Sequence, residues 1–165
     1  CDRRRPRGKR AGVIGKPYDS TDDTLAHIDK VREMLWEFKA GLVERARLHD
    51  ASKLLCPEKE AFDILTPRLK GLTYGSDEYR ASIREMQPAI DYHYSLNAHH
   101  PEHRPGGIGD MDLVDIVEMF CDWKAATMRH ADGDMQKSIV HNQGRFAIAP
   151  QLAQILENTR QRMGW

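Results

Sequence analysis

The sequence is poor in cysteine, with Cys1, Cys56 and Cys121 scattered over 165 residues without close spacing. An odd number of widely separated cysteines argues against a disulfide scaffold and against a zinc knuckle. A reducing compartment fits this cysteine usage, so we expect a cytoplasmic protein. The sequence also lacks any run of about eighteen consecutive apolar residues, which argues against a membrane-spanning helix and a membrane partner.

An excess of charge of either sign is also missing, because 25 basic residues balance 25 acidic residues. The balance conceals an asymmetry. Residues 1–16 hold seven of the basic residues and one acid, which leaves the rest of the chain at about −6. A domain that binds nucleic acid through its body usually has the opposite sign. We therefore expect residues 1–17 to form a basic, flexible extension, and any nucleic acid to bind only there.

Strand signals are nearly absent, and apolar residues recur mostly at helical spacing. A helix is expected after Thr21, interrupted at Gly41 and followed by a short helix to about Leu48. Further helices are expected from Pro57 to Thr66, from Ser76 to His100 with a kink or a break at Pro88, from Asp110 or Asp112 to about Ala131, at Met135–Asn142, and from Pro150 to about Arg162. We predict an all-α fold of six or seven helices in a single compact domain at residues 18–165.

Adjacent histidine and aspartate residues, His49 and Asp50, stand at a predicted helix end. Both can bind one metal ion, and a carboxylate can also bridge two ions because it has two oxygens. The dipeptide alone is weak evidence, so its meaning depends on distant partners. One candidate partner is His27, although a lone histidine beside an apolar stripe is more often a core or surface residue.

Histidines are dense further along the chain, with four between residues 93 and 103: His93, His99, His100 and His103. His93 and His100 are seven residues apart, which is about 20° short of two helical turns, so both face one side of a helix. Pro101 sets the helix end near His100. This density favours a metal site over a solvated polar helix end.

The helix predicted to follow Asp112 is apolar on all sides, which is typical of a largely buried helix. Asp115, Glu118, Asp122 and Arg129 nevertheless form one stripe along it. Buried acids need a cation, and Arg129 alone cannot neutralise three of them. Two explanations remain open: a cavity that holds a metal ion, or an ion-pair network with basic residues of neighbouring helices.

The order of these residues on an all-α frame resembles the HD-domain superfamily of metal-dependent phosphohydrolases. More closely, the chain resembles a small, poorly characterised family of HD-like proteins found in phage and bacterial genomes. The similar segments are Asp23–Ile28, His49–Lys53, Pro57–Phe62, Thr73–Tyr79, His99–His103 and Glu118–Lys124, over roughly residues 18–160. The resemblance implies an HD-like fold with one ion held by His27, His49, Asp50 and Asp122. It also implies a second ion, held by His93 and by His100 or its neighbour His99, with Asp50 as the bridge.

The predicted function is a metal-dependent phosphohydrolase that acts on a nucleotide or a similar small phosphate ester. One or two divalent transition metal ions (Mn, Fe, Co, Ni or Zn) would lower the pKa of a bound water and shield the phosphate charge. Lys53, one turn after Asp50, is predicted to bind a phosphate oxygen as a point charge. The predicted catalytic residues are Asp50 and Lys53, the predicted substrate-binding residues are Lys53, His99 and Lys124, and Glu60 and Lys124 are candidates for outer-shell contacts.

Two other functions fit the same residues. Four histidines and two aspartates around two ions also resemble the di-iron oxygenases built on the HD frame, and metal content and oxygen dependence would separate these from a hydrolase. A binding module without catalysis is the third interpretation. There, residues 1–17 would recruit a nucleic acid or a protein, and their deletion would abolish the activity.

Overall fold

The computed structural model describes residues 18–72, 76–129 and 133–165. Within these ranges every regular element is a helix, so the all-α prediction is confirmed. None of the described helices combines the length and the apolar character that crossing a membrane requires. The basic extension predicted for residues 1–17 lies outside the described residues, as does the start of the segment Thr73–Tyr79.

The chain divides into two units, and the boundary falls inside helix α1 (Thr21–Leu48). The first unit ends at Glu37, and its described part consists of residues 18–37. The second unit, Phe38–Trp165, contains the last turns of α1 and all later elements. It therefore contains every predicted metal ligand except His27.

Helix α1 continues through Gly41, where the sequence predicted an interruption, so that prediction was wrong. Glycine is about 1 kcal/mol less favourable than alanine inside a helix, which was the basis of the prediction. A Cβ built at Gly41 would lie 3.8 Å from Cγ2 of Val114, so this position faces helix α4 (Leu113–Thr127). Packing between helices outweighs local propensity here, as it does for most helices in folded proteins.

Replacing Gly41 by alanine should stabilise the protein by about 0.5–1 kcal/mol, because alanine loses less conformational entropy in a helix. The added methyl group meets Val114 at 3.8 Å, an ordinary van der Waals distance. Urea unfolding measures the change. The matched control is Ala40→Gly, an exposed position on the same helix, where a loss of similar size is expected. A lower unfolding midpoint for Gly41→Ala would mean that α1 and α4 pack closely only when position 41 has no side chain.

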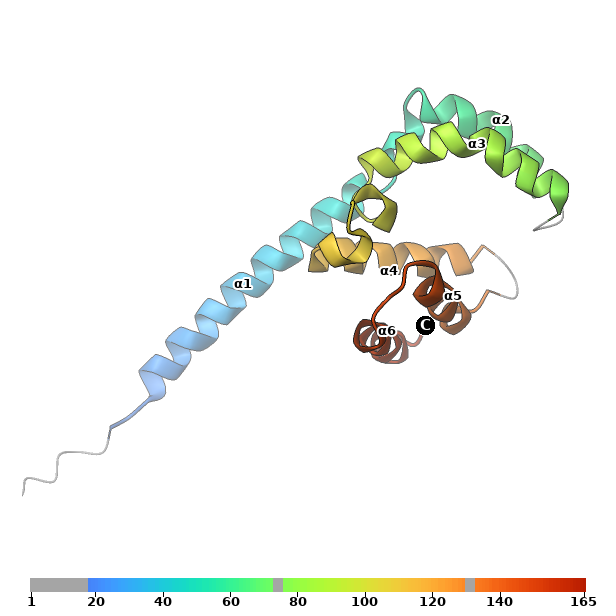
Figure 1. Cartoon of the computed structure of the whole chain (residues 1–165). Helices are drawn as coiled ribbons and strands as arrows, with labels where there is room; N and C mark the ends of the chain where they lie inside the picture. Colours follow the sequence, from blue (N-terminus) through green and yellow to red (C-terminus); the bar gives the residue numbers. More distant parts are fainter. Residues whose placement is uncertain (1–17, 73–75, 130–132) are drawn as a thin grey trace, which may run out of the picture. The chain divides into compact units, whose positions relative to one another are not determined.

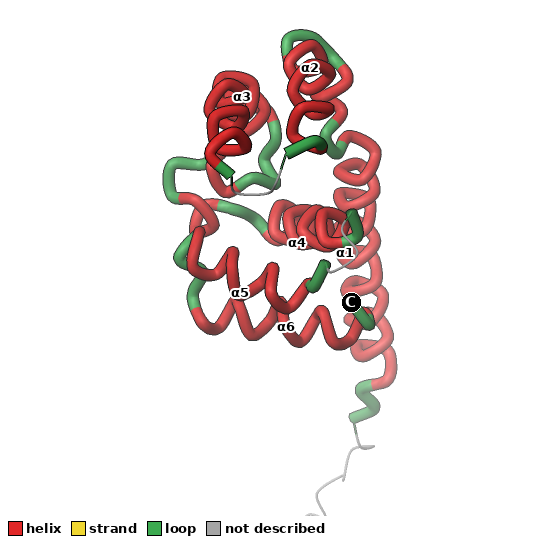
Figure 2. Tube along the Cα trace, turned by 90° about the vertical axis from the view of Figure 1, so that its right-hand side faces the viewer, coloured by secondary structure: helices red, strands yellow, loops and turns green. Residues whose placement is uncertain are grey.

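Two helical pairs lie on either side of α4 in the second unit. Helices α2 (Glu58–Lys70) and α3 (Asp77–Leu96) lie side by side, and so do α5 (Met135–Arg145) and α6 (Pro150–Met163) (Figures 1 and 2). Figure 2 shows α4 between the two pairs. Short 3-10 turns at Ala51–Leu54, Pro101–His103 and Gly107–Asp110 join the elements around the predicted ligands.

Two prolines lie inside helices where the sequence predicted an end or a kink. Helix α2 continues past Pro67 to Lys70, and α3 is one helix that includes Pro88. An internal proline removes one backbone hydrogen bond and crowds the preceding turn, which costs about 3 kcal/mol. Packing between α2 and α3 supports the helix after Pro67, where Arg68 pairs with Glu85 at 3.1 Å. Helix α3 then ends at Leu96, four residues before the predicted end at His100.

The hydrophobic core lies between α4, α5 and α6. Its buried residues are Phe120, Met135, Ile139 and Leu156, and Trp123 and Trp165 pack against them. Parts of α4 are not covered, because Leu113 is 67% exposed and Val117 is 38% exposed. The sequence predicted a largely buried helix, but only one side of α4 contributes to the core. Its remaining surface is available to the site described next.

Candidate metal centre

The predicted His-Asp pair stands where α1 gives way to a 3-10 turn. Asp50 has φ 55° and ψ 14°, the left-handed conformation that aspartate tolerates better than most residues. Helix α1 ends immediately before the pair, so the chain changes direction at the residue with the carboxylate. His49 and Asp50 are each half-buried.

Four side chains bring one potential ligand atom each to a common point: Asp50, His93, His99 and His100. Oδ1 of Asp50 lies 3.2 Å from Nε2 of His93 and 3.6 Å from Nε2 of His99. Nε2 of His93 lies 2.9 Å from Nε2 of His100. Neighbouring ligands about 2.1 Å from one ion lie about 3.0–3.4 Å apart, depending on the coordination geometry. The four atoms are therefore spaced like ligands of a single ion.

Two of these atoms are buried without a hydrogen-bond partner, namely Oδ1 of Asp50 and Nε2 of His99. Buried polar atoms are nearly always satisfied in folded proteins, because an unsatisfied one costs free energy. The two atoms are 3.6 Å apart, so one cation would satisfy both. The residues present fit a metal ion on this observation.

Two glutamates contact the histidines at Nδ1, the ring nitrogen that points away from the cluster. Nδ1 of His93 lies 2.8 Å from Oε2 of Glu58, the closest of the groups around that nitrogen. Oε1 of Glu118 lies 3.0 Å from Nδ1 of His49 and 3.2 Å from Nδ1 of His99. The tautomer that donates from Nδ1 leaves a free lone pair on Nε2, and metal-binding histidines are usually held in this way.

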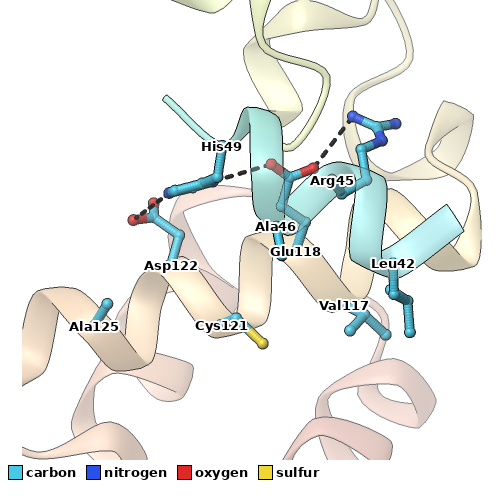
Figure 3. Close-up of a pocket in the computed structure, with 9 residues that line it drawn as sticks. All are labelled: Leu42, Arg45, Ala46, His49, Val117, Glu118, Cys121, Asp122 and Ala125. Atoms are coloured by element: carbon cyan, nitrogen blue, oxygen red, sulfur yellow. Dashed lines mark hydrogen bonds and ion pairs between the residues drawn. The ribbon is translucent and has the colours of Figure 1, made fainter. Parts of the chain in front are cut away.

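His49 and Asp122 face each other at the end of α1 and on α4 (Figure 3). Nε2 of His49 lies 3.7 Å from Oδ1 of Asp122 and 3.7 Å from Oδ2 of Asp50. This spacing is longer than the roughly 3.0–3.4 Å expected for neighbouring ligands of one ion about 2.1 Å away. Since Oδ1 of Asp50 faces the other three histidines, its carboxylate is placed between two groups of ligands. Nζ of Lys53 also donates to Oδ2 of Asp50, at 2.6 Å.

The protonation states of Asp50 and His100 suit a cation, whereas His49 is protonated while no cation is bound. The nearby carboxylate of Asp122 outweighs burial and raises the pKa of His49 to about 9, so metal binding by His49 would release this proton. Burial opposes the ionisation of Asp50, but the nearby His93 imidazole and the Lys53 ammonium group hold its pKa well below the ordinary value. Burial, together with the neighbouring His99 and His93, lowers the pKa of His100 to about 3. An ionised carboxylate and a neutral imidazole are the forms that bind metal ions.

The acidic residues of α4 do not all have the same kind of partner, and the sequence left open a metal-binding cavity or an ion-pair network. Asp115 is fully buried and pairs with Arg45 and Arg104, which is the ion-pair network. Asp122 faces His49, on the side of the candidate ligands. Glu118 belongs to both, because it pairs with Arg45 at 3.2 Å and accepts from two histidines.

The sequence profile of a family of unknown function, DUF5662, matches residues 16–162. The chain belongs to this family. No curated protein and no solved structure matches it. A function for this DUF5662 protein is therefore inferred from the geometry of the site.

Other predicted site residues lie outside these ligand groups. A second candidate group found among the described residues consists of His49, His99 and Glu118. Neither group includes Asp122 or His27, which is exposed on α1 in the first unit, so the metal roles of these two residues stay predictions. Lys124 is half-buried on α4, and its substrate-binding role also stays a prediction. His99 is 2% exposed, and this burial suits a ligand better than the predicted contact with substrate. Both His99 and His100 point Nε2 into the cluster, so the geometry does not favour one of them over the other as a ligand.

Glu58 was missed by sequence reasoning, which named Glu60 instead. Glu60 is exposed and accepts a hydrogen bond from Cys56, whereas Glu58 is 1% exposed and contacts His93. The available signal was the position of Glu58 directly after Pro57, at the first residue of α2. A carboxylate at a helix start is usually explained by the helix dipole, which hid its second role.

Replacing Glu118 by glutamine should weaken the binding of a transition metal ion by about 10- to 100-fold, because outer partners of ligating histidines contribute this much. The neutral amide oxygen is a weaker acceptor than a carboxylate oxygen, and the amide nitrogen would face the guanidinium group of Arg45. Isothermal titration with Zn²⁺ or Mn²⁺ measures the change. Glu44→Gln is the control, because Glu44 is exposed and pairs with Arg47 at the surface. Equal affinities for Glu118→Gln and the wild type would remove Glu118 from the site.

Proposed function

We propose that this protein is a metal-dependent phosphohydrolase that acts on a nucleotide or a similar small phosphate ester. The observation that carries the proposal is the pair of buried, unpartnered atoms, Oδ1 of Asp50 and Nε2 of His99, within a set of imidazole nitrogens. This supports a cation site built from neutral nitrogen and anionic oxygen, which suits divalent transition metals. The order of His49, Asp50 and Asp122 on a helical frame supports hydrolysis, by resemblance to HD-domain enzymes.

Each residue then has a defined task. Asp50, His93, His99 and His100 would hold one ion, and His49 and Asp122 would hold a second, with Asp50 between them. A metal ion in such a site lowers the pKa of a bound water and offsets charge on the phosphate. The side chain of Lys53 is 33% exposed and forms an ion pair with the carboxylate of Asp50. Its ammonium group can therefore exchange this partner for a phosphate oxygen when substrate binds. We also propose a cytoplasmic protein, since Cys56 and Cys121 are free thiols.

The test begins with metal analysis of the purified full chain. The protein, loaded in turn with Mn, Fe, Co, Ni and Zn, is then screened for phosphate release from nucleoside mono-, di- and triphosphates. We expect bound metal, and phosphate release that falls at least about 100-fold in Asp50→Asn, because metal-site chemistry depends on the ligand. Asp63→Asn, an exposed acid on α2, should leave the rate unchanged.

Two outcomes would overturn the proposal. A chain that retains no metal and releases no phosphate from any of these substrates has no hydrolytic metal site. Oxygen uptake without phosphate release, measured on the same iron-loaded sample, would support a di-iron oxygenase on the same ligands instead.

A further inference from the structure

A groove of about 460 Å³ opens beside His49 and Asp122, between the last turns of α1 and one face of α4 (Figure 3). This volume lies within the range of small-molecule sites, about 300–1,000 Å³. His49 and Asp122 line the groove themselves, so it adjoins the candidate metal centre directly. A substrate held at the metal centre would have its remaining part next to this groove.

The walls of the groove are apolar and built from small side chains. Leu42 and Ala46 contribute from α1, and Val117, Cys121 and Ala125 contribute from α4. The three α4 residues recur every fourth position, so they form one continuous strip along the helix. All three are exposed, and hence they contribute little to the hydrophobic core. An apolar strip that the core does not use, next to candidate ligands, favours a binding role.

The charges along the groove are already matched. Arg45 is the one lysine or arginine among its described lining residues, and it pairs with Asp115 and Glu118. His49 lies 3.7 Å from Asp122 and contacts Glu118. The walls therefore offer no unmatched cation for a second phosphate and few groups for a hydroxyl-rich sugar. An uncharged apolar group would enter without leaving a buried polar atom unpaired.

We propose that the groove binds the organic part of the substrate, and that this part is an uncharged, apolar aryl or alkyl group. The substrate class is then a phosphate monoester of an apolar alcohol, with its phosphate at His49 and Asp122. The phosphate end rests on the function proposed above, whereas the groove rests on its own lining. Ala125 and Cys121 determine how large a group fits, because larger side chains there would fill the space.

The experiment compares two phosphonates that cannot be hydrolysed, 1-naphthylmethylphosphonate and methylphosphonate, by calorimetry on the metal-loaded full chain. We expect the naphthyl compound to bind at least 10-fold more tightly. Ala125→Phe should remove most of this advantage and leave the affinity for methylphosphonate unchanged. The matched control is Ala126→Phe, because Ala126 is the next residue on α4, is also exposed and lies outside the groove lining. Ala46→Phe tests the opposite wall, and circular dichroism verifies the helical fold of each variant.

1-Naphthol, which has no phosphate, separates the two proposals. Its fluorescence should show binding with or without metal, and Ala125→Phe should abolish that binding. If naphthol binds in this way but no phosphate ester is hydrolysed, the hydrolase proposal fails and the groove proposal holds. Equal affinities for the two phosphonates, or equal effects of Ala125→Phe and Ala126→Phe on the naphthyl affinity, would overturn the groove proposal. The proposal would also be overturned if Ala125→Phe changed the molecular mass measured by light scattering but left the affinity for the naphthyl phosphonate unchanged. The groove would then be an interface between copies of the chain.

Discussion

Asp115→Asn is expected to lower the free energy of unfolding by about 3 kcal/mol, at the lower end of the range for broken buried ion pairs. The carboxylate of Asp115 is completely buried and pairs with both Arg45 and Arg104. It also accepts from the backbone N–H of Asp112 in the capping box at the start of α4. Asparagine keeps the shape but leaves two guanidinium groups facing each other. The lower end applies because Arg45 and Arg104 remain 30% and 28% exposed, so water relieves part of the cost.

Thermal unfolding measures this change as a fall in Tm of roughly 6–12 °C for a chain of this length. Asp63→Asn is the control, because Asp63 is 62% exposed and pairs with Lys59 on the same helix. Such surface pairs contribute about 0–1 kcal/mol. Comparable stabilities of the two variants would mean that the arginines find other partners, and that the network around Asp115 does not fix α4 to α1.

Removal of metal is expected to have the next largest effect. A ligand that binds only the native state stabilises it by about 2.7 kcal/mol at a hundred times its dissociation constant. A chelator should therefore lower Tm by roughly 5–10 °C. The site offers such an ion two ionised carboxylates, because nearby imidazole and ammonium groups outweigh burial and lower the pKa of Asp50 and of Asp122.

Asp50→Asn supplies the control for this measurement. The variant loses one negative charge and one ligand, so added metal should raise its Tm much less than it raises the wild-type Tm. Scanning calorimetry with and without EDTA provides both numbers. A chelator that leaves the wild-type Tm unchanged would show that the histidine cluster is stable without an ion and would remove the basis of the metal centre.

The sequence was sufficient for the fold class and for expecting several of the candidate ligands to lie close together. His93 and His100 could be placed on one side from their spacing, and the structure brings their Nε2 atoms to 2.9 Å. The placement succeeded although α3 ends at Leu96, because the chain after the helix carries His100 back towards His93. Asp122 could be linked to His49 only through the resemblance, since nothing local relates residues on two different helices.

The sequence did not allow a prediction of which side chains pair with the buried acids. Asp115 and Asp122 stand on one stripe of one helix, yet Asp115 meets Arg45 and Arg104 while Asp122 meets His49. Which cation a buried acid meets depends on how neighbouring helices cross, and helical spacing does not encode that. The helix ends predicted at Gly41 and Pro67 were wrong for a related reason. Packing between helices outweighs the intrinsic preferences of single residues.

The left-handed backbone at Asp50 separates two kinds of selection at this position. Only glycine, asparagine and aspartate adopt such a conformation at low cost. In a library randomised at codon 50, survivors chosen for folding alone should include all three residues. Survivors chosen for a bound metal ion should include aspartate alone. Comparing the two sets of survivors would show how far this position is constrained by the turn that ends α1 and how far by chemistry.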